Sequence, residues 1–297
     1  MIKRASVETL SQELVSLAIA YEDNLRAYTV AFAEEGGGCV RRTPEATCTS
    51  FPFTYWTNGI VSPRLRQADP VAGLNENLAW FRELGREVWV HAGPSSEPEN
   101  LAMILKARGL HNYHNRPFMA CDLSHLIAEY SIPEGVRISI VGDYGLFTDL
   151  PHPILGCPTT PRLRRIFGTM EKLAESDPRR HWELVAWKDQ RPVGSGILFL
   201  DQGRAGIYDV EVIEPLRGQG IGTALLQEMC VFARDQGASL VSLAASERGA
   251  AFYPRFGFVQ AGRWPTYYYS RAKQRRDADA AAPMLGVERD EAGHGRR

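Results

Sequence analysis

A glycine-rich stretch from Tyr208 to Leu226 holds the residues of this chain whose types and spacing could do chemistry. It reads YDVEVIEPLRGQGIGTALL, a strand-like apolar pattern, then glycines, then a helical pattern. A turn of this kind leaves backbone N–H groups unpaired at the start of the helix, and these groups and the helix dipole attract phosphate. Glycines let a ligand approach the backbone closely. The stretch therefore predicts a phosphate-binding loop at Arg217–Thr223.

Two common phosphate-binding motifs do not fit this loop. A dinucleotide fingerprint requires a third glycine where this chain has Thr223, and a P-loop requires a Gly-Lys-Ser/Thr sequence that is absent. The spacing is instead Arg217-x-x-Gly220-x-Gly222. It resembles the acetyl-CoA pyrophosphate loop of the GNAT (GCN5-related N-acetyltransferase) superfamily, Gln/Arg-x-x-Gly-x-Gly/Ala.

The sequence around the loop strengthens this resemblance. A Val-x-Val strand and Pro215 precede the loop, and a helix and the strand Ser239–Ala245 follow it. Further on, Ala251–Phe258 resembles the family's Tyr-x-x-x-Gly-Phe signature. The resemblance covers residues 136–270. It implies an α+β fold with a mixed, mostly antiparallel sheet flanked by helices, and acetyl-CoA as co-substrate.

The resemblance also implies roles for individual residues. Val210 and Val212 would form backbone hydrogen bonds with the pantetheine arm, and Tyr253 would protonate the departing CoA thiolate. Ser246 stands where the family often has an asparagine that contacts the cofactor, and its shorter side chain puts that contact in doubt. The pyrophosphate would be bound by the backbone amides of Arg217, Gly218, Gln219, Gly220, Ile221, Gly222 and Thr223.

The general base is left open between two carboxylates. An amine attacks a thioester without a covalent enzyme nucleophile, so the enzyme must position both partners, take a proton from the amine and stabilise charge at the carbonyl. Asp209 and Glu211 precede the loop and share one face of the expected strand, whereas Val210 and Val212 share the other. Both carboxylates could equally be solvated strand residues, and Tyr253 could be a core aromatic.

The expected function is the transfer of an acetyl group from acetyl-CoA to a primary amine, by direct attack in a ternary complex. A small-molecule acceptor lying between the two halves of the chain is favoured, because domain interfaces commonly hold ligands. Three alternatives stay open: a GNAT-fold enzyme such as a decarboxylase that acts on an acyl-CoA or acyl carrier without amine acetylation, a non-catalytic acyl-CoA-binding module, and a protein acetyltransferase.

Composition narrows the class of protein. The net charge of -1 argues against a nucleic-acid partner, and the five cysteines include no Cys-x-x-Cys pair. His91 and His181 have no partner at metal-binding spacing, so we expect no metal. The sequence has no apolar run of the roughly 20 residues that a membrane span needs. We therefore expect a cytoplasmic protein without a membrane partner; its oligomeric state is not predicted.

Hydrophobic periodicity predicts two α+β halves. The first half is expected to hold helices at 6–35, 70–84 and 98–108 and strands at 51–56, 87–91 and 118–123, with His111 and His114 in a loop. Both halves contain a strand, turn, helix and strand in similar order. This is either coincidence or a duplication whose first copy lost its cofactor loop. The expected domains are a degenerate GNAT-like domain at 1–130, a catalytic domain at 131–270 and a disordered tail at 271–297.

Overall fold

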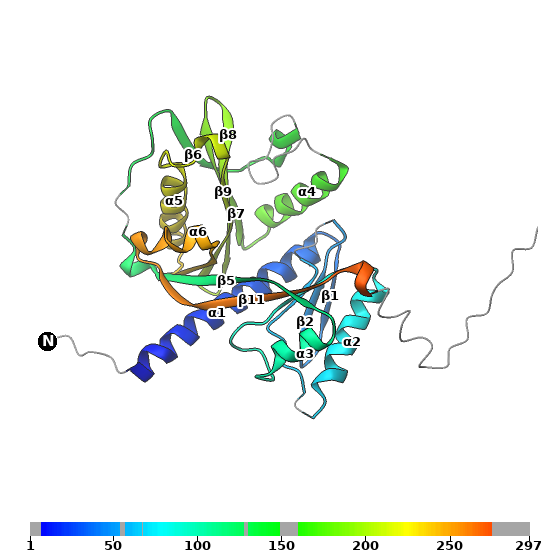
Figure 1. Cartoon of the computed structure of the whole chain (residues 1–297). Coiled ribbons are helices and arrows are strands. Elements are labelled where there is room, and N and C mark those ends of the chain that lie inside the picture. Colours follow the sequence, from blue (N-terminus) through cyan, green and yellow to red (C-terminus); the bar gives the residue numbers. More distant parts are fainter. Residues whose placement is uncertain (1–6, 54–56, 67, 128–129, 149–159, 275–297) are drawn as a thin grey trace, which may run out of the picture.

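The computed structural model describes residues 7–53, 57–66, 68–127, 130–148 and 160–274. The strands in these ranges are β1 Cys39–Arg42, β2 Thr47–Ser50, β3 Gly59–Val61, β4 Val88–His91, β5 His111–Asp122, β6 Val136–Ile140, β7 His181–Lys188, β8 Arg191–Asp201, β9 Arg204–Val212, β10 Leu240–Ala244 and β11 Val259–Tyr269. They form one sheet in the order β1-β2-β3-β4-β11-β5-β10-β9-β8-β7-β6 (Figure 1). Most neighbours are antiparallel; β3–β4 and β9–β10 are parallel.

Helices pack against this sheet. They are α1 Val7–Glu35, α2 Pro70–Glu83, α3 Leu101–Ala107, α4 Pro161–Glu175, α5 Ile221–Asp235 and α6 Glu247–Ala250, with short 3-10 turns η1 Leu123–His125, η2 Tyr144–Thr148, η3 Glu214–Leu216 and η4 Tyr253–Phe256. Among the described residues, no helix combines the length and apolar character needed to cross a membrane.

The two halves of the chain exchange strands at the centre of the sheet. In each half a parallel pair is joined by a crossover helix: β3–α2–β4 in the first and β9–α5–β10 in the second. The next strand then crosses over. β5, from the first half, pairs antiparallel with β10, and β11, from the second half, pairs antiparallel with β4. β5 and β11 also pair with each other, so each half completes the sheet of the other.

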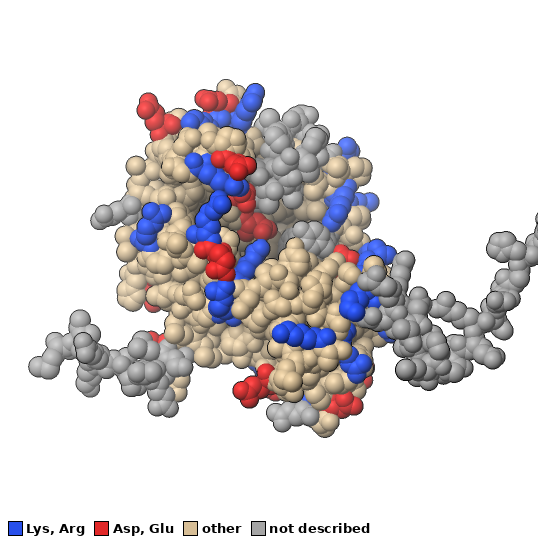
Figure 2. All heavy atoms as spheres, viewed as in Figure 1, with Lys and Arg blue, Asp and Glu red and all other residues tan. Residues whose placement is uncertain are grey.

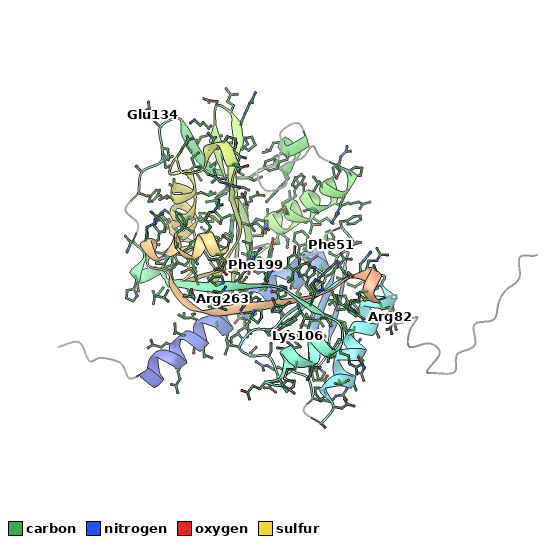
Figure 3. The ribbon with its side chains drawn as sticks, in the orientation of Figure 1. Phe51, Arg82, Lys106, Glu134, Phe199 and Arg263 are labelled. Atoms are coloured by element: carbon green, nitrogen blue, oxygen red, sulfur yellow. The ribbon has the colours of Figure 1, made fainter. Side chains whose placement is uncertain are left out.

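The long helix α1 runs behind this central region and packs on both halves (Figure 1). Its Tyr28 and Phe32 belong to one buried cluster with Phe51 of the first half and Phe199 of the second, two residues that are labelled in Figure 3. The side chain of Asn24, also on α1, is 1% exposed and donates hydrogen bonds to two carbonyl oxygens of the second half. α1 therefore connects the two halves by packing and hydrogen bonds, on the face of the sheet opposite α5.

Most expected elements are present, but three expectations differ from the structure. The aromatic segment 51–56 is not a strand over its described residues 51–53; the strand is β2, which ends at Ser50. His111 and His114 lie on β5, which is longer than expected because it pairs along β11. Residues 271–274 form a helical turn in which Gln274 donates to the carbonyl oxygen of Arg86, whereas Trp56 and residues 275–297 lie outside the described ranges.

Candidate active site

Strands β9 and β10 separate at the point where the site begins. Residues Leu240–Ser242 of β10 pair with Arg204–Gly206 of β9, and beyond that point Ile207–Val212 pair with β8 alone. The backbone of Val210 and Val212 therefore borders an opening in the sheet. Their side chains pack toward α5, Val210 beside Met229 and Val212 beside Ile221, as the predicted alternation requires.

A β-bulge interrupts β9 at Asp209. The two steps of β8 from Ser195 to Ile197 face the three steps of β9 from Glu211 to Tyr208, and Asp209 has a φ of 51°. Bulges often re-aim side chains beside active sites. Asp209 is exposed and lies close enough to α1 for its charge to raise the pKa of Tyr28, although burial is the larger cause. Asp209 therefore lies on the face of the sheet away from α5.

The glycine loop leaves the start of α5 without a side-chain cap. Gly218 and Gly220 have φ values of 78° and 82°, in the left-handed region that glycine adopts without strain. Gly220 is the N-cap, and its carbonyl accepts a hydrogen bond from Ala224 N at 3.0 Å. The amides that precede Ala224 in the first turn have no intrahelical acceptor. This helix start can therefore accept a phosphate group.

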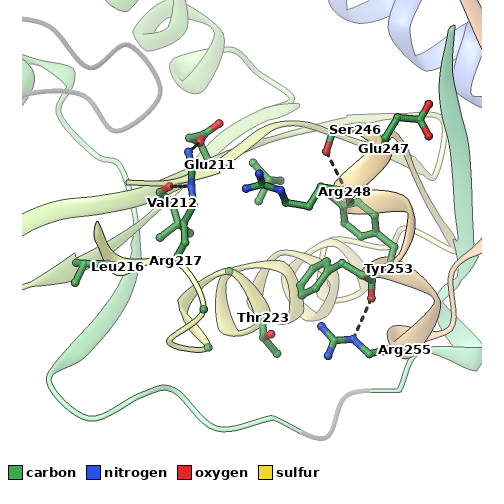
Figure 4. Close-up of a pocket in the computed structure, with 16 residues that line it drawn as sticks. Glu211, Val212, Leu216, Arg217, Thr223, Ser246, Glu247, Arg248, Tyr253 and Arg255 are labelled. Carbon is green, nitrogen blue, oxygen red and sulfur yellow. Dashed lines mark hydrogen bonds and ion pairs between the residues drawn. The ribbon is translucent and has the colours of Figure 1, made fainter. Parts of the chain in front are cut away.

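The loop, the opening and the segment after β10 enclose a cleft of about 1140 Å³ (Figure 4). Ten of the predicted site residues line it: Val210, Glu211, Val212, Arg217, Gly218, Gly220, Gly222, Thr223, Ser246 and Tyr253. Three do not. Gln219 bends back to donate to the Pro215 carbonyl, the Ile221 side chain is buried in the core, and Asp209 lies on the other face. Gln219 and Ile221 could contribute only backbone amides to a ligand here.

Arg217 turns its side chain back onto β9. Its Nε donates to the Val212 carbonyl oxygen at 2.8 Å, and its guanidinium forms an ion pair with Glu211. The Glu211 carboxylate is thus engaged by a cation in this conformation. Arg217 and its partner Glu211 lie at the edge of the opening, across the cleft from Tyr253 (Figure 4).

Tyr253 is held at the opposite wall by aromatic packing. Its ring contacts Phe252 and Phe258 at centroid distances of 5.3 and 5.5 Å. Burial raises the pKa of Tyr253 to about 12, with a smaller contribution from Cys230. The hydroxyl therefore stays protonated across the physiological range, which suits a proton donor.

Six residues that line the cleft were not predicted: Leu216, Glu247, Arg248, Gly249, Phe252 and Arg255. Arg255 lies over the rings of Phe252 and Phe256 and donates to the Phe252 carbonyl oxygen. Arg248 extends from α6 across the cleft (Figure 4). The hydroxyl of Ser246 is already used, because it caps α6 by accepting a hydrogen bond from Gly249 N at 3.0 Å. The aromatic motif Ala251–Phe258 contained a signal for Phe252 and Arg255, whereas Arg248 had none.

The corresponding region of the first half is closed by its own chain. After β3 and β4, Leu65 N donates to the Glu97 carbonyl oxygen and Glu97 N to the Pro63 carbonyl oxygen. These bonds fill the gap that stays open between β9 and β10. The crossover helix also differs, since the Asp69 carboxylate caps α2 by accepting from Ala72 N at 2.9 Å. A carboxylate at the helix start repels phosphate. Of the two crossover helices, only α5 therefore has a start that suits phosphate binding.

Comparison with known proteins agrees with this geometry. The model of the acetyltransferase (GNAT) family matches residues 152–258. The chain carries a domain of the GNAT acetyltransferase family. The predicted resemblance and the prediction of an acyltransferase domain are both confirmed by this match.

One curated relative shares part of this GNAT domain. The glucosamine 6-phosphate N-acetyltransferase of Trypanosoma brucei brucei is 39% identical over 75 residues, which are 23% of this chain and 51% of the relative. The chain therefore matches about half the length of that relative.

Solved structures show the fold over most of the chain. A GCN5-related N-acetyltransferase from Kribbella flavida aligns with a TM-score of 0.58 and 14% identity, over 82% of this chain and 94% of that one. A tandem GNAT protein from the clavulanic acid biosynthesis pathway aligns with a TM-score of 0.53 and 16% identity, over 79% of each chain. The predicted fold class, a mixed and mostly antiparallel sheet flanked by helices, is confirmed.

Proposed function

We propose that this protein is an acetyl-CoA-dependent N-acetyltransferase that acetylates the primary amine of a small molecule. One observation carries the proposal: the open edge of β9, the uncapped start of α5 and the Tyr253 hydroxyl border a single cleft. Pantetheine would run along Val210 and Val212 as an added strand. The pyrophosphate would meet the amides of Arg217–Thr223. The thioester would then lie within the cleft, between β9 and Tyr253.

The reaction needs one proton acceptor and one proton donor. The amine nitrogen attacks the thioester carbonyl carbon, the C–S bond breaks, and the sulfur leaves with the bonding electrons. Tyr253 donates its proton to that sulfur, and a carboxylate takes the proton lost by the amine. We assign the second role to Asp209, because it lies on the face of the sheet away from the cofactor loop, whereas Glu211 lines the cofactor cleft itself.

The first half of the chain does not serve as a second cofactor site in this proposal. Its opening is closed by Pro63–Leu65 and Glu97, and its crossover helix starts at a carboxylate. We infer a tandem arrangement, with a degenerate GNAT-like domain at 1–130 and a catalytic domain at 131–270. The acceptor then lies between the two halves, beside the exchanged strands. The relative named for an amino sugar phosphate supports a small acceptor with a primary amine.

The test is the amine-dependent release of free CoA thiol by wild type and by Tyr253→Phe. Loss of the proton donor should lower kcat about 100-fold or more, and acetyl-CoA affinity should change less than about threefold. Tyr130→Phe is the matched control, because it removes a hydroxyl that binds Glu228 outside the cleft. Equal kcat values for Tyr253→Phe and wild type would contradict the role of Tyr253. Binding of acetyl-CoA without thiol release from any amine would favour the non-catalytic alternative.

A further inference from the structure

Strand β5 carries two polar residues toward the face where the acceptor would bind. Arg116 is exposed and pairs across the strands with Trp264 of β11, which packs on α1. The Arg116 side chain forms no hydrogen bond or ion pair with any residue that the structure describes, although its backbone is part of the β5–β11 ladder. His114 precedes it by two residues, is half-buried, and its Nδ1 has no hydrogen-bond partner among the described residues. β5 therefore presents a cation and, beside it, a half-buried imidazole on the α1 side of the sheet.

Tyr21 of α1 lies near both Arg116 and Asp209. The Tyr21 ring lies 5.0 Å from that of Trp264, the cross-strand partner of Arg116, and 6.3 Å from that of Tyr208, which precedes Asp209. Burial raises the pKa of the Tyr21 hydroxyl, Arg116 acts to lower it, and Asp209 acts to raise it. Opposite charges from β5 and β9 thus both act on one hydroxyl.

The sheet register explains this juxtaposition. β10 lies between β9 and β5, and its last residue, Ala244, pairs with Phe118 of β5. Arg116 follows Phe118 along the antiparallel direction, so it extends past the end of β10. Asp209 extends past the same end on β9, beyond the last pair of those strands at Gly206. The strand exchange therefore places a basic residue of the first half opposite the proposed base of the second.

The histidines beside Arg116 are neutral at physiological pH. Burial, and then the charge of Arg116, lower the pKa of His114 to about 4. Nearby, His91 accepts a hydrogen bond from Trp264 Nε1 at 3.2 Å, and its pKa is lowered to about 3, mainly by burial. A neutral imidazole can donate one hydrogen bond to an anion, and the guanidinium supplies the charge. Figure 2 shows basic and acidic side chains close together down the middle of the molecule, beside a hollow.

We propose that the acceptor carries an anionic group, a phosphate or a carboxylate, which Arg116 and His114 bind while the amine reaches Asp209. This inference rests on the proposed function. It gives the first half a role in the reaction: it supplies, through β5, the subsite that selects the acceptor. A guanidinium group binds a phosphate or a carboxylate through two parallel hydrogen bonds. The acceptors tested must therefore include both a phosphate and a carboxylate.

The experiment compares amines that differ only in the anion. Thiol release would be measured with glucosamine 6-phosphate against glucosamine, and with tyrosine against tyramine, for wild type, Arg116→Gln and Arg108→Gln. Arg108 is an exposed arginine at the end of α3 and serves as the matched control. We expect wild type to prefer the anionic member of one pair at least about tenfold in kcat/KM, mainly through KM, a ratio that corresponds to about 1.4 kcal/mol. Arg116→Gln should lose this preference, and Arg108→Gln should keep it.

The outcomes separate this inference from the proposed function. Acetylation of both members of each pair with no preference in wild type would overturn the inference and leave the function standing. A preference retained by Arg116→Gln would also overturn it. A weakened acetyl-CoA affinity in Arg116→Gln, with the acceptor preference unchanged, would assign Arg116 to the cofactor instead. Tight binding of acetyl-CoA with no thiol release from any of the four amines would refute both.

Discussion

Arg217 Nε donates a hydrogen bond to the carbonyl oxygen of Val212 at 2.8 Å, so the first residue of the cofactor loop is bound to the strand that the cofactor would join. The same guanidinium pairs with Glu211. Pantetheine that pairs with β9 needs the backbone groups at this edge. Cofactor binding therefore requires Arg217 to leave Val212 and turn toward the phosphates.

Glu211→Gln should tighten acetyl-CoA binding. The substitution removes the charge that holds Arg217 on β9 and a negative charge that repels the cofactor phosphates. We expect Kd to fall roughly two- to tenfold at low salt, with a smaller effect at high salt because the contact is partly exposed and screened. The control is Glu214→Gln, which removes the same charge from the neighbouring turn η3 without affecting the ion pair. Equal or weaker binding by Glu211→Gln than by Glu214→Gln would contradict this account.

Two amide substitutions should identify the general base. Asp209→Asn should lower kcat about 100-fold or more, because the amide cannot take a proton from the amine. Glu211→Gln should leave kcat within about threefold of wild type. Both would be measured at saturating amine and acetyl-CoA. The reverse pattern would assign the base to Glu211 and would mean that the Arg217 ion pair opens before the chemical step.

The raised pKa of Tyr253 predicts the alkaline side of the pH profile. Its protonated form donates to the thiolate, so activity is lost only as the pH rises through the folded-state pKa of about 12. A tyrosine with the ordinary pKa of about 10 would lose half its activity at pH 10. We expect kcat, corrected for spontaneous thioester hydrolysis, to stay level up to about pH 10. A descending limb centred at or below that pH would argue against Tyr253 as the donor.

Asn24 should be important for stability because it links α1 to the second half. Its Nδ2 donates to the carbonyl oxygens of Phe199 and Arg204, and its Oδ1 accepts from the Tyr208 hydroxyl at 2.6 Å. Asn24→Leu leaves these buried groups unpaired and should lower the free energy of unfolding by about 2–4 kcal/mol in urea titrations. Asn75→Leu, on the exposed side of α2, is the control. A loss no larger than that of the control would show that α1 is not fixed through Asn24.

The sequence predicted best the elements whose ends carry local signals. α2 begins at Pro70 after the Asp69 cap, and α5 begins after Gly220, as their residue types indicate. The segment at 51–56 was wrongly predicted to be a strand, because aromatic content alone does not distinguish a strand from a turn that packs in a core. The short strands β1 and β3 are too brief to show a period.

What the sequence could not predict depends on distant contacts. The exchange of β5 and β11 joins residues far apart in the chain, such as Arg116 and Trp264, which are 148 positions apart, and neither strand has a local sequence feature that identifies its partner. His114 was therefore expected in a loop. The bulge at Asp209 puts a non-glycine residue at positive φ without any local sequence signal. The glycine loop and Tyr253 were predicted because their spacing resembles a family, whereas Arg248 and Arg116 lie outside its motifs.

The most direct test of the central claim is calorimetric titration of acetyl-CoA into wild type, Gly220→Glu and Gly237→Glu. Gly220 and Gly237 flank the two ends of α5 with φ values of 82° and 86°, so both substitutions impose similar backbone strain, but only Gly220 borders the cleft. We predict micromolar-scale binding by wild type and Gly237→Glu and no measurable binding by Gly220→Glu, whose carboxylate would repel the pyrophosphate. Equal binding by all three proteins, or no binding by wild type, would contradict a cofactor site at this loop.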